Sequence, residues 1–446
     1  MKYLNYKKNL IAISLFLIAA LFSACNTKSA DTENTEDRNA EDIIVAEENP
    51  EADSYISDLE ASNEFYPDYR ENEDYTYTLY PDHVIITAYN GSDEIVNIPE
   101  KLDNVPVKEI STYVFYKNES IREVTIPSSV EQIGEEAFRS CKNLETVTIN
   151  ANIKKLEDMT FYLCTSLKKV TLPEGLEEIG KKAFDNCDLL EEIIFPESLS
   201  VIGNEAFIYC SSLKSIAFPE NLTVIGADSF AFCENIGGSL VIPKSITQLG
   251  AAAFHSCNFD SVAIPDGIEE IPTFFLANNS NLTEIFIPDG VKKIGFSAFS
   301  NCDNLNSVRI PDTVAMIGED AFYNTKWYHN LDDEFVIVGD GVLLKCNSDK
   351  YRLTVPEGIK SISPKAFDNC YSKFITLPEG VESIGKFAFS SMDIVNVTIP
   401  LSVTNIEAPI FSSQNTGAAI TVLSEKSYAA KWAKEEGVTY SLPKEE

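Results

Sequence analysis

The sequence predicts an α/β repeat solenoid: a curved, right-handed coil with a parallel β-sheet on its concave side, an N-terminal β-hairpin cap and a C-terminal helix cap. Three observations predict it. Proline recurs at intervals of mostly 22 to 24 residues, Ile-Gly and Ala-Phe pairs follow it at fixed distances, and apolar residues fill the same slots in each copy. A fixed period of this length marks a solenoid, in which each unit buries its apolar face by stacking on its neighbours.

Residues 1–25 are predicted to be an export signal. Lysines in 2–8 precede an apolar run over 10–21, and two small residues lead to Cys25. The run is too short for a membrane-spanning helix. The segment resembles the signal of bacterial lipoproteins, although Phe22 stands where that family usually carries Leu. The resemblance implies acylation of Cys25 and anchoring to the outer face of the cell membrane; the alternative is cleavage before the cysteine and free secretion.

Residues 26–70 are expected to form a disordered tether. Thirteen acidic residues and one basic residue lie between positions 31 and 64, without helical or strand periodicity. Such a segment buries too little apolar surface to offset its ordering entropy, and charge repulsion extends it. An acidic recognition tail is the alternative interpretation.

Residues 71–110 are predicted to hold an N-terminal β cap and a first, degenerate repeat. Two β-rich segments, 75–79 and 83–89, alternate in polarity and are separated by a Pro-Asp turn signal. We expect this hairpin to cover the first rung, because an uncovered end rung exposes the core.

Residues 111–423 are assigned to the repeats. The clearest copy, 126–149, reads I-P-x-x-V-x-x-I-G-x-x-A-F-x-x-C-x-x-L-x-x-V-x-I. The V-x-I segment is expected to be a short strand that proline ends, since proline has no backbone N–H to donate. The Gly is expected to allow a sharp bend, and the Phe residues to stack as core. The marker prolines stand at positions 99, 127, 173, 196, 219, 243, 265, 288, 311, 356, 378 and 400.

This pattern resembles the leucine-rich repeats of the BspA-like, or Treponema-type, family. Copies such as 167–187 and 213–233 match its slots almost throughout, and the resemblance covers roughly 75–423. It implies a curved solenoid with a concave parallel sheet, a surface or secreted location, and a role in adhesion or binding.

An insert interrupts the repeats at about 326–350. Phe335–Val338, a Gly-Asp-Gly turn and Val342–Leu344 predict a β-hairpin that projects from the solenoid edge. We weigh a structural role for it against recognition.

Residues 424–446 are predicted to form the C-terminal cap, with Ser427 and Gly437 bounding a helix over 428–436.

Cysteine recurs in one slot of the repeat and is expected to be a buried small residue. One thiol per rung gives a column of parallel neighbours, which favours free thiols over disulfides. Asn279 and Thr325 fill the same slot in two copies, and Cys346 lies off the column. The column comprises Cys141, Cys164, Cys187, Cys210, Cys233, Cys257, Cys302 and Cys370.

Charge and motifs narrow the function. With 35 Lys and Arg against 69 Asp and Glu, the net charge is −34, which disfavours nucleic acid and anionic lipid as partners. Membrane contact is then expected only through the lipid anchor. No nucleophile elbow, phosphate loop, zinc-protease or calcium-loop motif occurs. We therefore predict a protein that is not an enzyme and has no cofactor and no metal.

One outward column of the strands is the candidate site. The residue two before each marker proline points away from the core, and over five consecutive rungs it is uncharged and apolar. These residues are Ile194, Ala217, Val241, Ala263 and Phe286, followed by Arg309. The neighbouring outward column holds Glu192, Ser215, Ser239, Ser261 and Glu284. At ~4.8 Å per rung the stripe is about 20 Å long, enough for an extended peptide or sugar chain.

The predicted partner is thus a protein or glycan on another cell, a host matrix or a polymer. Two alternatives stay open. The chain could be a structural spacer of the envelope without a ligand, or strand propensity alone could explain the stripe.

Overall fold

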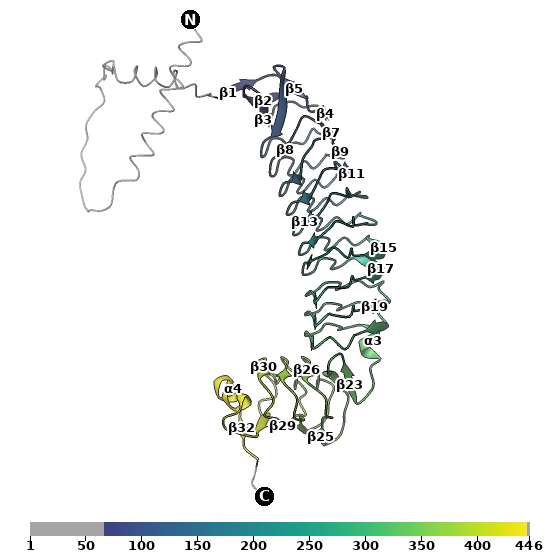
Figure 1. The fold of residues 1–446 in the computed structure, drawn as a ribbon, viewed down its shortest axis with the longest axis vertical. Helices are drawn as coiled ribbons and strands as arrows, with labels where there is room; N and C mark the ends of the chain where they lie inside the picture. The colour runs from purple at the N-terminus through teal and green to yellow at the C-terminus, as the bar shows by residue number, and fades with distance from the viewer. Residues whose placement is uncertain (1–66, 444–446) are drawn as a thin grey trace, which may run out of the picture. The chain divides into compact units, whose positions relative to one another are not determined.

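The repeats form a parallel β-solenoid in the computed structural model, which describes residues 67–443 (Figure 1). Successive turns pair in parallel on two faces, and the fold class predicted from the sequence is confirmed. The V-x-I segments build the face that we call the long-strand face. Its strands are β4 (Ile95–Asn97), β7 (Glu123–Ile126), β9 (Thr146–Ile149), β11 (Lys169–Thr171), β15 (Gly237–Val241), β17 (Asn258–Ala263), β19 (Glu284–Phe286), β21 (Ser307–Arg309), β25 (Arg352–Thr354), β27 (Phe374–Thr376), β29 (Asn396–Ile399) and β31 (Ala419–Val422).

The residues that precede the repeated Gly build the short-strand face, with two residues in each strand. Its strands are β8 (Gln132–Ile133), β10 (Lys155–Leu156), β12 (Glu178–Ile179), β13 (Val201–Ile202), β14 (Val224–Ile225), β16 (Gln248–Leu249), β18 (Glu270–Ile271), β20 (Lys293–Ile294), β22 (Met316–Ile317), β26 (Ser361–Ile362), β28 (Ser383–Ile384) and β30 (Asn405–Ile406). Pro272 follows β18, and no pairing joins β18 to β16 among the described strands. In the turn before, Gly250 N donates a hydrogen bond to Ile225 O. Pro272 takes the same position one turn later and has no N–H to donate such a bond.

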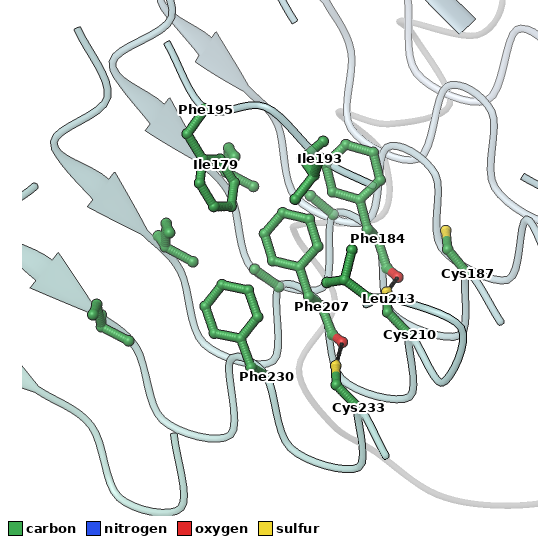
Figure 2. Packing of buried hydrophobic residues seen from close by; sticks show 14 of the residues in the cluster. Ile179, Phe184, Cys187, Ile193, Phe195, Phe207, Cys210, Leu213, Phe230 and Cys233 are labelled. Carbon is green, nitrogen blue, oxygen red and sulfur yellow. Dashed lines mark hydrogen bonds between the residues drawn. The ribbon is translucent and has the colours of Figure 1, made fainter. Parts of the chain in front are cut away.

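The core between the two faces is a column of stacked phenylalanines. The rings of Phe184, Phe207 and Phe230 lie 5.0 and 5.1 Å apart between centroids, almost parallel, and are fully buried (Figure 2). Stacked rings of this kind bury large apolar areas and stabilise the contact between neighbouring turns.

The cysteine column lies beside the phenylalanines, and its thiols are free and buried, as predicted. Cys210 Sγ donates to Phe184 O at 3.2 Å, and Cys233 Sγ donates to Phe207 O at 3.1 Å (Figure 2). Burial raises the pKa of the Cys187 thiol well above its usual range. Burial thus keeps the Cys187 thiol neutral, and each thiol from Cys141 to Cys302 donates to a carbonyl group of the preceding turn.

The explanation given above for the repeated glycine is wrong. Gly226 is not in the left-handed region; a Cβ atom there would lie 2.5 Å from the backbone N of Asn204 and the carbonyl carbon of Gly203. Glycine is thus required by close contact with the preceding turn. Positive φ angles fall instead on non-glycine residues of the next loop, such as Lys182 at 57° and Glu205 at 58°.

The cap at the N-terminus is a β-hairpin of β2 (Tyr75–Leu79) and β3 (Val84–Tyr89), as predicted. β3 pairs in parallel with β6 (Val105–Ile110), and β6 in turn pairs in parallel with β8. β5 (Lys101–Leu102) pairs with β6 in the antiparallel sense. The tether boundary predicted at residue 70 is wrong, because β1 (Asp68–Glu71) pairs with β2. All four β1 residues are exposed, so no apolar pattern marks this strand. The predicted signal, Cys25 and the tether up to residue 66 lie outside the described residues.

The insert does form a hairpin, of β23 (Phe335–Val338) and β24 (Val342–Cys346), but it does not project as predicted. β24 pairs in parallel with β26 and is buried along its whole length. Cys346 N donates to Ala366 O, the bond that Phe367 makes to Ala388 one turn later, so Cys346 takes the phenylalanine place in its turn. A short helix, α3 (Lys326–His329), precedes the hairpin.

The predicted C-terminal cap is present. Ser427 Oγ accepts from Ala430 N at the start of α4 (Tyr428–Glu436), and Gly437 ends the helix with φ 71°. Trp432 packs into the last turns, and the final strand β32 (Tyr440–Ser441) pairs with β31.

Candidate ligand-binding surface

Five residues on the long-strand face form the candidate surface, which we call the stripe: Ile194, Ala217, Val241, Ala263 and Phe286. All five are exposed, as the alternation of the strands predicts. The exposed fractions of Ile194, Val241 and Phe286 are 72%, 65% and 54%. Large apolar side chains are thus exposed at three of five consecutive turns, and this exposure is what makes the stripe a candidate binding surface.

The stripe does not lie on one continuous sheet, and this differs from the prediction. β15 pairs with β17, placing Val241 beside Ala263, and β19 pairs with β21, placing Phe286 beside Arg309. The segments around Ile194 and Ala217 make only a single bridge, between Lys169 and Glu192. The turns still stay in register, because Lys214 N donates to Glu191 O and Gly237 N to Lys214 O.

Two phenylalanines explain the missing strands. Phe195 and Phe218 each stand directly before a marker proline. The turns that have a strand on this face carry Ile, Leu or Val in that position. The Phe195 ring packs against Phe207 at 5.7 Å between centroids (Figure 2). It packs against Phe218 at 6.0 Å. The short strands β13 and β14 of the same turns remain paired on the opposite face. We infer that the bulk of the two rings prevents regular strand pairing on the stripe side.

The neighbouring column of hydroxyls lies where it was predicted. Ser215 and Ser239 are exposed, and Ser261 Oγ donates to Ser239 Oγ at 2.8 Å. Glu192 and Glu284 are exposed at its two ends. This side of the stripe is polar but nearly uncharged along its centre.

A row of acids borders the other side of the stripe, and the sequence reasoning missed it. We call it the acidic row: Glu197, Glu220, Asp266 and Asp289, with Lys244 at the middle turn. Each residue follows a marker proline and is exposed. Arg309, from the stripe column, reaches Asp289 at 3.7 Å between Nη2 and Oδ1, which places the two columns side by side. The signal was present in the sequence as one acidic residue after successive prolines.

The carboxylates of the acidic row differ from others nearby. On the far side of the hydroxyl column, Lys168 pairs with Glu145 at 2.6 Å and Lys214 pairs with Glu191 at 2.5 Å. Those pairs lower the pKa of Glu145 and Glu191. Within residues 67–443, Glu197, Glu220 and Asp266 take part in no ion pair. Three of the four carboxylates beside the stripe are therefore without an ion-pair partner in the described residues.

A surface hollow of about 450 Å³ lies one turn beyond the stripe. Arg309 and Trp327 both line it. Its lining is completed by Val308, Ile310, Asp312, Ile337, Val338 and Gly339. The hollow thus extends the stripe column toward the insert hairpin.

No group of three or more His, Cys, Asp or Glu side chains in residues 67–443 is arranged to hold a metal ion. In the same part of the chain, no helix is long and apolar enough to cross a membrane.

Comparison with known proteins agrees with the architecture. A structure of a leucine-rich repeat protein from Bacteroides ovatus is 26% identical, with a TM-score of 0.58, covering 84% of this chain and 100% of that one. A leucine-rich cell surface protein from Faecalibacterium prausnitzii is 22% identical over 84% and 99% of the two chains, with a TM-score of 0.36. The pneumococcal vaccine antigen PcpA is 18% identical over 85% and 99%, with a TM-score of 0.44. None of the curated proteins matches the sequence.

The repeat pattern decides the family. The family model described as "BspA type Leucine rich repeat region" matches residues 108–237, 201–329 and 336–431. Together these ranges are more than two thirds of the sequence. These ranges contain the phenylalanine and cysteine columns and every turn of the stripe. The chain therefore belongs to the family of BspA-type leucine-rich repeat proteins.

Proposed function

We propose that this chain is a cell-surface binding protein that holds an extended ligand along the stripe. The observation that carries the proposal is the exposure of Ile194, Val241 and Phe286 in one column of a strongly acidic chain. Aligned apolar side chains of this size are uncommon on a surface without a partner. The fold supplies no nucleophile, metal cluster or enclosed pocket at this place, so binding is the chemistry that it supports.

Surface display is part of the proposal. A cell-surface leucine-rich protein stands among the similar structures, and the apolar run before Cys25 supports export with a lipid anchor. Cys25→Ser should release the protein to the medium or leave an unprocessed precursor. The measurement is incorporation of radiolabelled palmitate, and labelling that persists in the variant would contradict the anchor.

The stripe is tested by the double variant Phe286→Ala, Val241→Asp. Binding to the cells or matrix that retain the wild type is measured together with the melting temperature. We expect binding to be lost and the melting temperature to change little, because both side chains point to solvent.

Leu401→Asp removes an exposed apolar side chain outside the stripe and is the control. Undiminished binding by the folded double variant would remove the stripe as the site and favour the hollow at Trp327. A wild type that binds nothing would favour a structural spacer.

A further inference from the structure

We propose that the occupant of the stripe is a cationic, extended polypeptide segment, with apolar side chains on the stripe and lysine or arginine side chains on the acidic row. This inference rests on the proposed function and names the chemistry of its ligand. Its first support is the match of the two columns. Each of the five turns that gives a residue to the stripe also gives one to the row, three positions later.

The chain's own Arg309 shows how a cation on this column is accommodated. Its guanidinium lies 3.7 Å from the Asp289 carboxylate of the preceding turn, with its side chain 63% exposed. A basic side chain of a ligand lying over Val241 or Phe286 would meet Glu220 or Asp266 of the preceding turn in the same way. The two alanines of the stripe leave space between the larger residues for the ligand backbone to approach.

Charge complementarity is the second support. Two acids elsewhere on this face, Glu145 and Glu191, are paired by lysines one turn away. The row carries four carboxylates and one lysine, and Glu197, Glu220 and Asp266 have no ion-pair partner within residues 67–443. Such a row attracts cations and repels anions, which speeds association with a basic partner.

The chemistry of the stripe favours a polypeptide over a glycan. Ile194 and Val241 are aliphatic, which leaves Phe286 as the one ring face of the stripe on which a sugar could stack. A neutral glycan would leave the carboxylates without a cation, and an anionic glycan would be repelled. An extended chain advances ~3.3 Å per residue, so about six residues span the stripe. Lysine and arginine can bury their aliphatic stems on the apolar column while their charged ends reach the row.

The test uses the full chain and four fluorescent probes: a twelve-residue peptide of alternating valine and lysine, its valine-glutamate and serine-lysine counterparts, and a neutral oligosaccharide. Fluorescence anisotropy reports binding at low and at high salt. We expect the valine-lysine peptide to bind most tightly and to weaken as salt rises, because exposed ion pairs are screened.

Three variants then separate the parts of the surface. Glu220→Gln with Asp266→Asn should weaken the valine-lysine peptide by about three- to tenfold, the scale of two exposed ion pairs. Lys244→Glu should tighten it. The control is Glu174→Gln with Glu357→Gln, which removes two charges from the same slot outside the stripe, next to Thr171 and Thr354. It should leave binding within twofold of the wild type.

The outcomes distinguish this inference from the proposed function. Loss of binding in Phe286→Ala, Val241→Asp, with acid variants equal to their control, would keep the stripe as a site and overturn its cationic ligand. Preference for the oligosaccharide would do the same. Peptide binding that survives both sets of variants would overturn the inference and the stripe together.

Discussion

A single missing side chain sets how closely successive turns approach. At Gly226 the backbone of the preceding turn occupies the volume that a Cβ atom would need. The pattern of the sequence predicts that a glycine belongs in this slot, but it does not reveal the reason. Contact between turns is a property of the tertiary structure. A sharp bend and a close backbone approach both require glycine, so the sequence alone does not distinguish the two causes.

Gly226→Ala should therefore destabilise the chain. The Cβ atom would lie 2.5 Å from two backbone atoms, and moving a packed backbone costs about 1 to 3 kcal/mol. Gly417 has nothing within 4 Å of its Cβ position and no positive φ, so Gly417→Ala should be neutral or slightly stabilising. Thermal or urea unfolding measures both. Equal stabilities of the two variants would contradict the claim that close contact between turns requires glycine at position 226.

His255 should make stability depend on pH. Its Nε2 lies 3.0 Å from Asn278 Nδ2, and burial lowers its pKa, opposed by Asp228. Between the lowered folded pKa and the ordinary value of about 6.5, the unfolded chain binds a proton that the folded chain does not. The free energy of unfolding should thus fall as pH drops below about 6.5. Urea unfolding of wild type and His255→Gln at pH 7.5 and 5.5 measures this, and the variant should lose less stability over that interval.

At the scale of the strands, the two turns without pairing on the long-strand face should exchange amide hydrogens faster than their neighbours. Residues 193–195 and 216–218 lack the ladder that protects β9 and β11. Hydrogen exchange followed by mass spectrometry should show low protection there and higher protection in β13 and β14 of the same turns. Phe195→Ile with Phe218→Ile should raise protection on the long-strand face. Uniform protection in the wild type would contradict the role of the two rings.

Strand alternation was sufficient to predict which side chains of the stripe are exposed. It could not predict the interruption, because Phe195 and Phe218 satisfy the apolar pattern as well as isoleucine does. Their effect arises from ring volume in a core shared with Phe207. The acidic row was missed for another reason. Its residues were counted toward the net charge, whereas Glu220 and Asp266 gain meaning only from their position beside the stripe.

At the scale of the whole molecule, β24 connects two apolar cores. Val342 and Leu344 belong to the core of the preceding turns, and Leu343 and Cys346 belong to the core of the turns that follow. The hairpin itself was predictable, because its turn and its alternation are local. Its pairing with β26 was not, since that contact depends on residues beyond the insert. The insert is thus a turn of the solenoid whose five strand residues are all buried.

Protection of the stripe on binding tests the account most directly. Hydrogen exchange of the full chain is compared with and without the valine-lysine peptide, or with the matrix component that the chain retains. The account predicts new protection in residues 192–194, 215–217, 237–241, 258–263 and 284–286, and none in β25, β27 and β29, where threonine takes the stripe position. Protection confined to the hollow at Trp327, or to the second core, would contradict it.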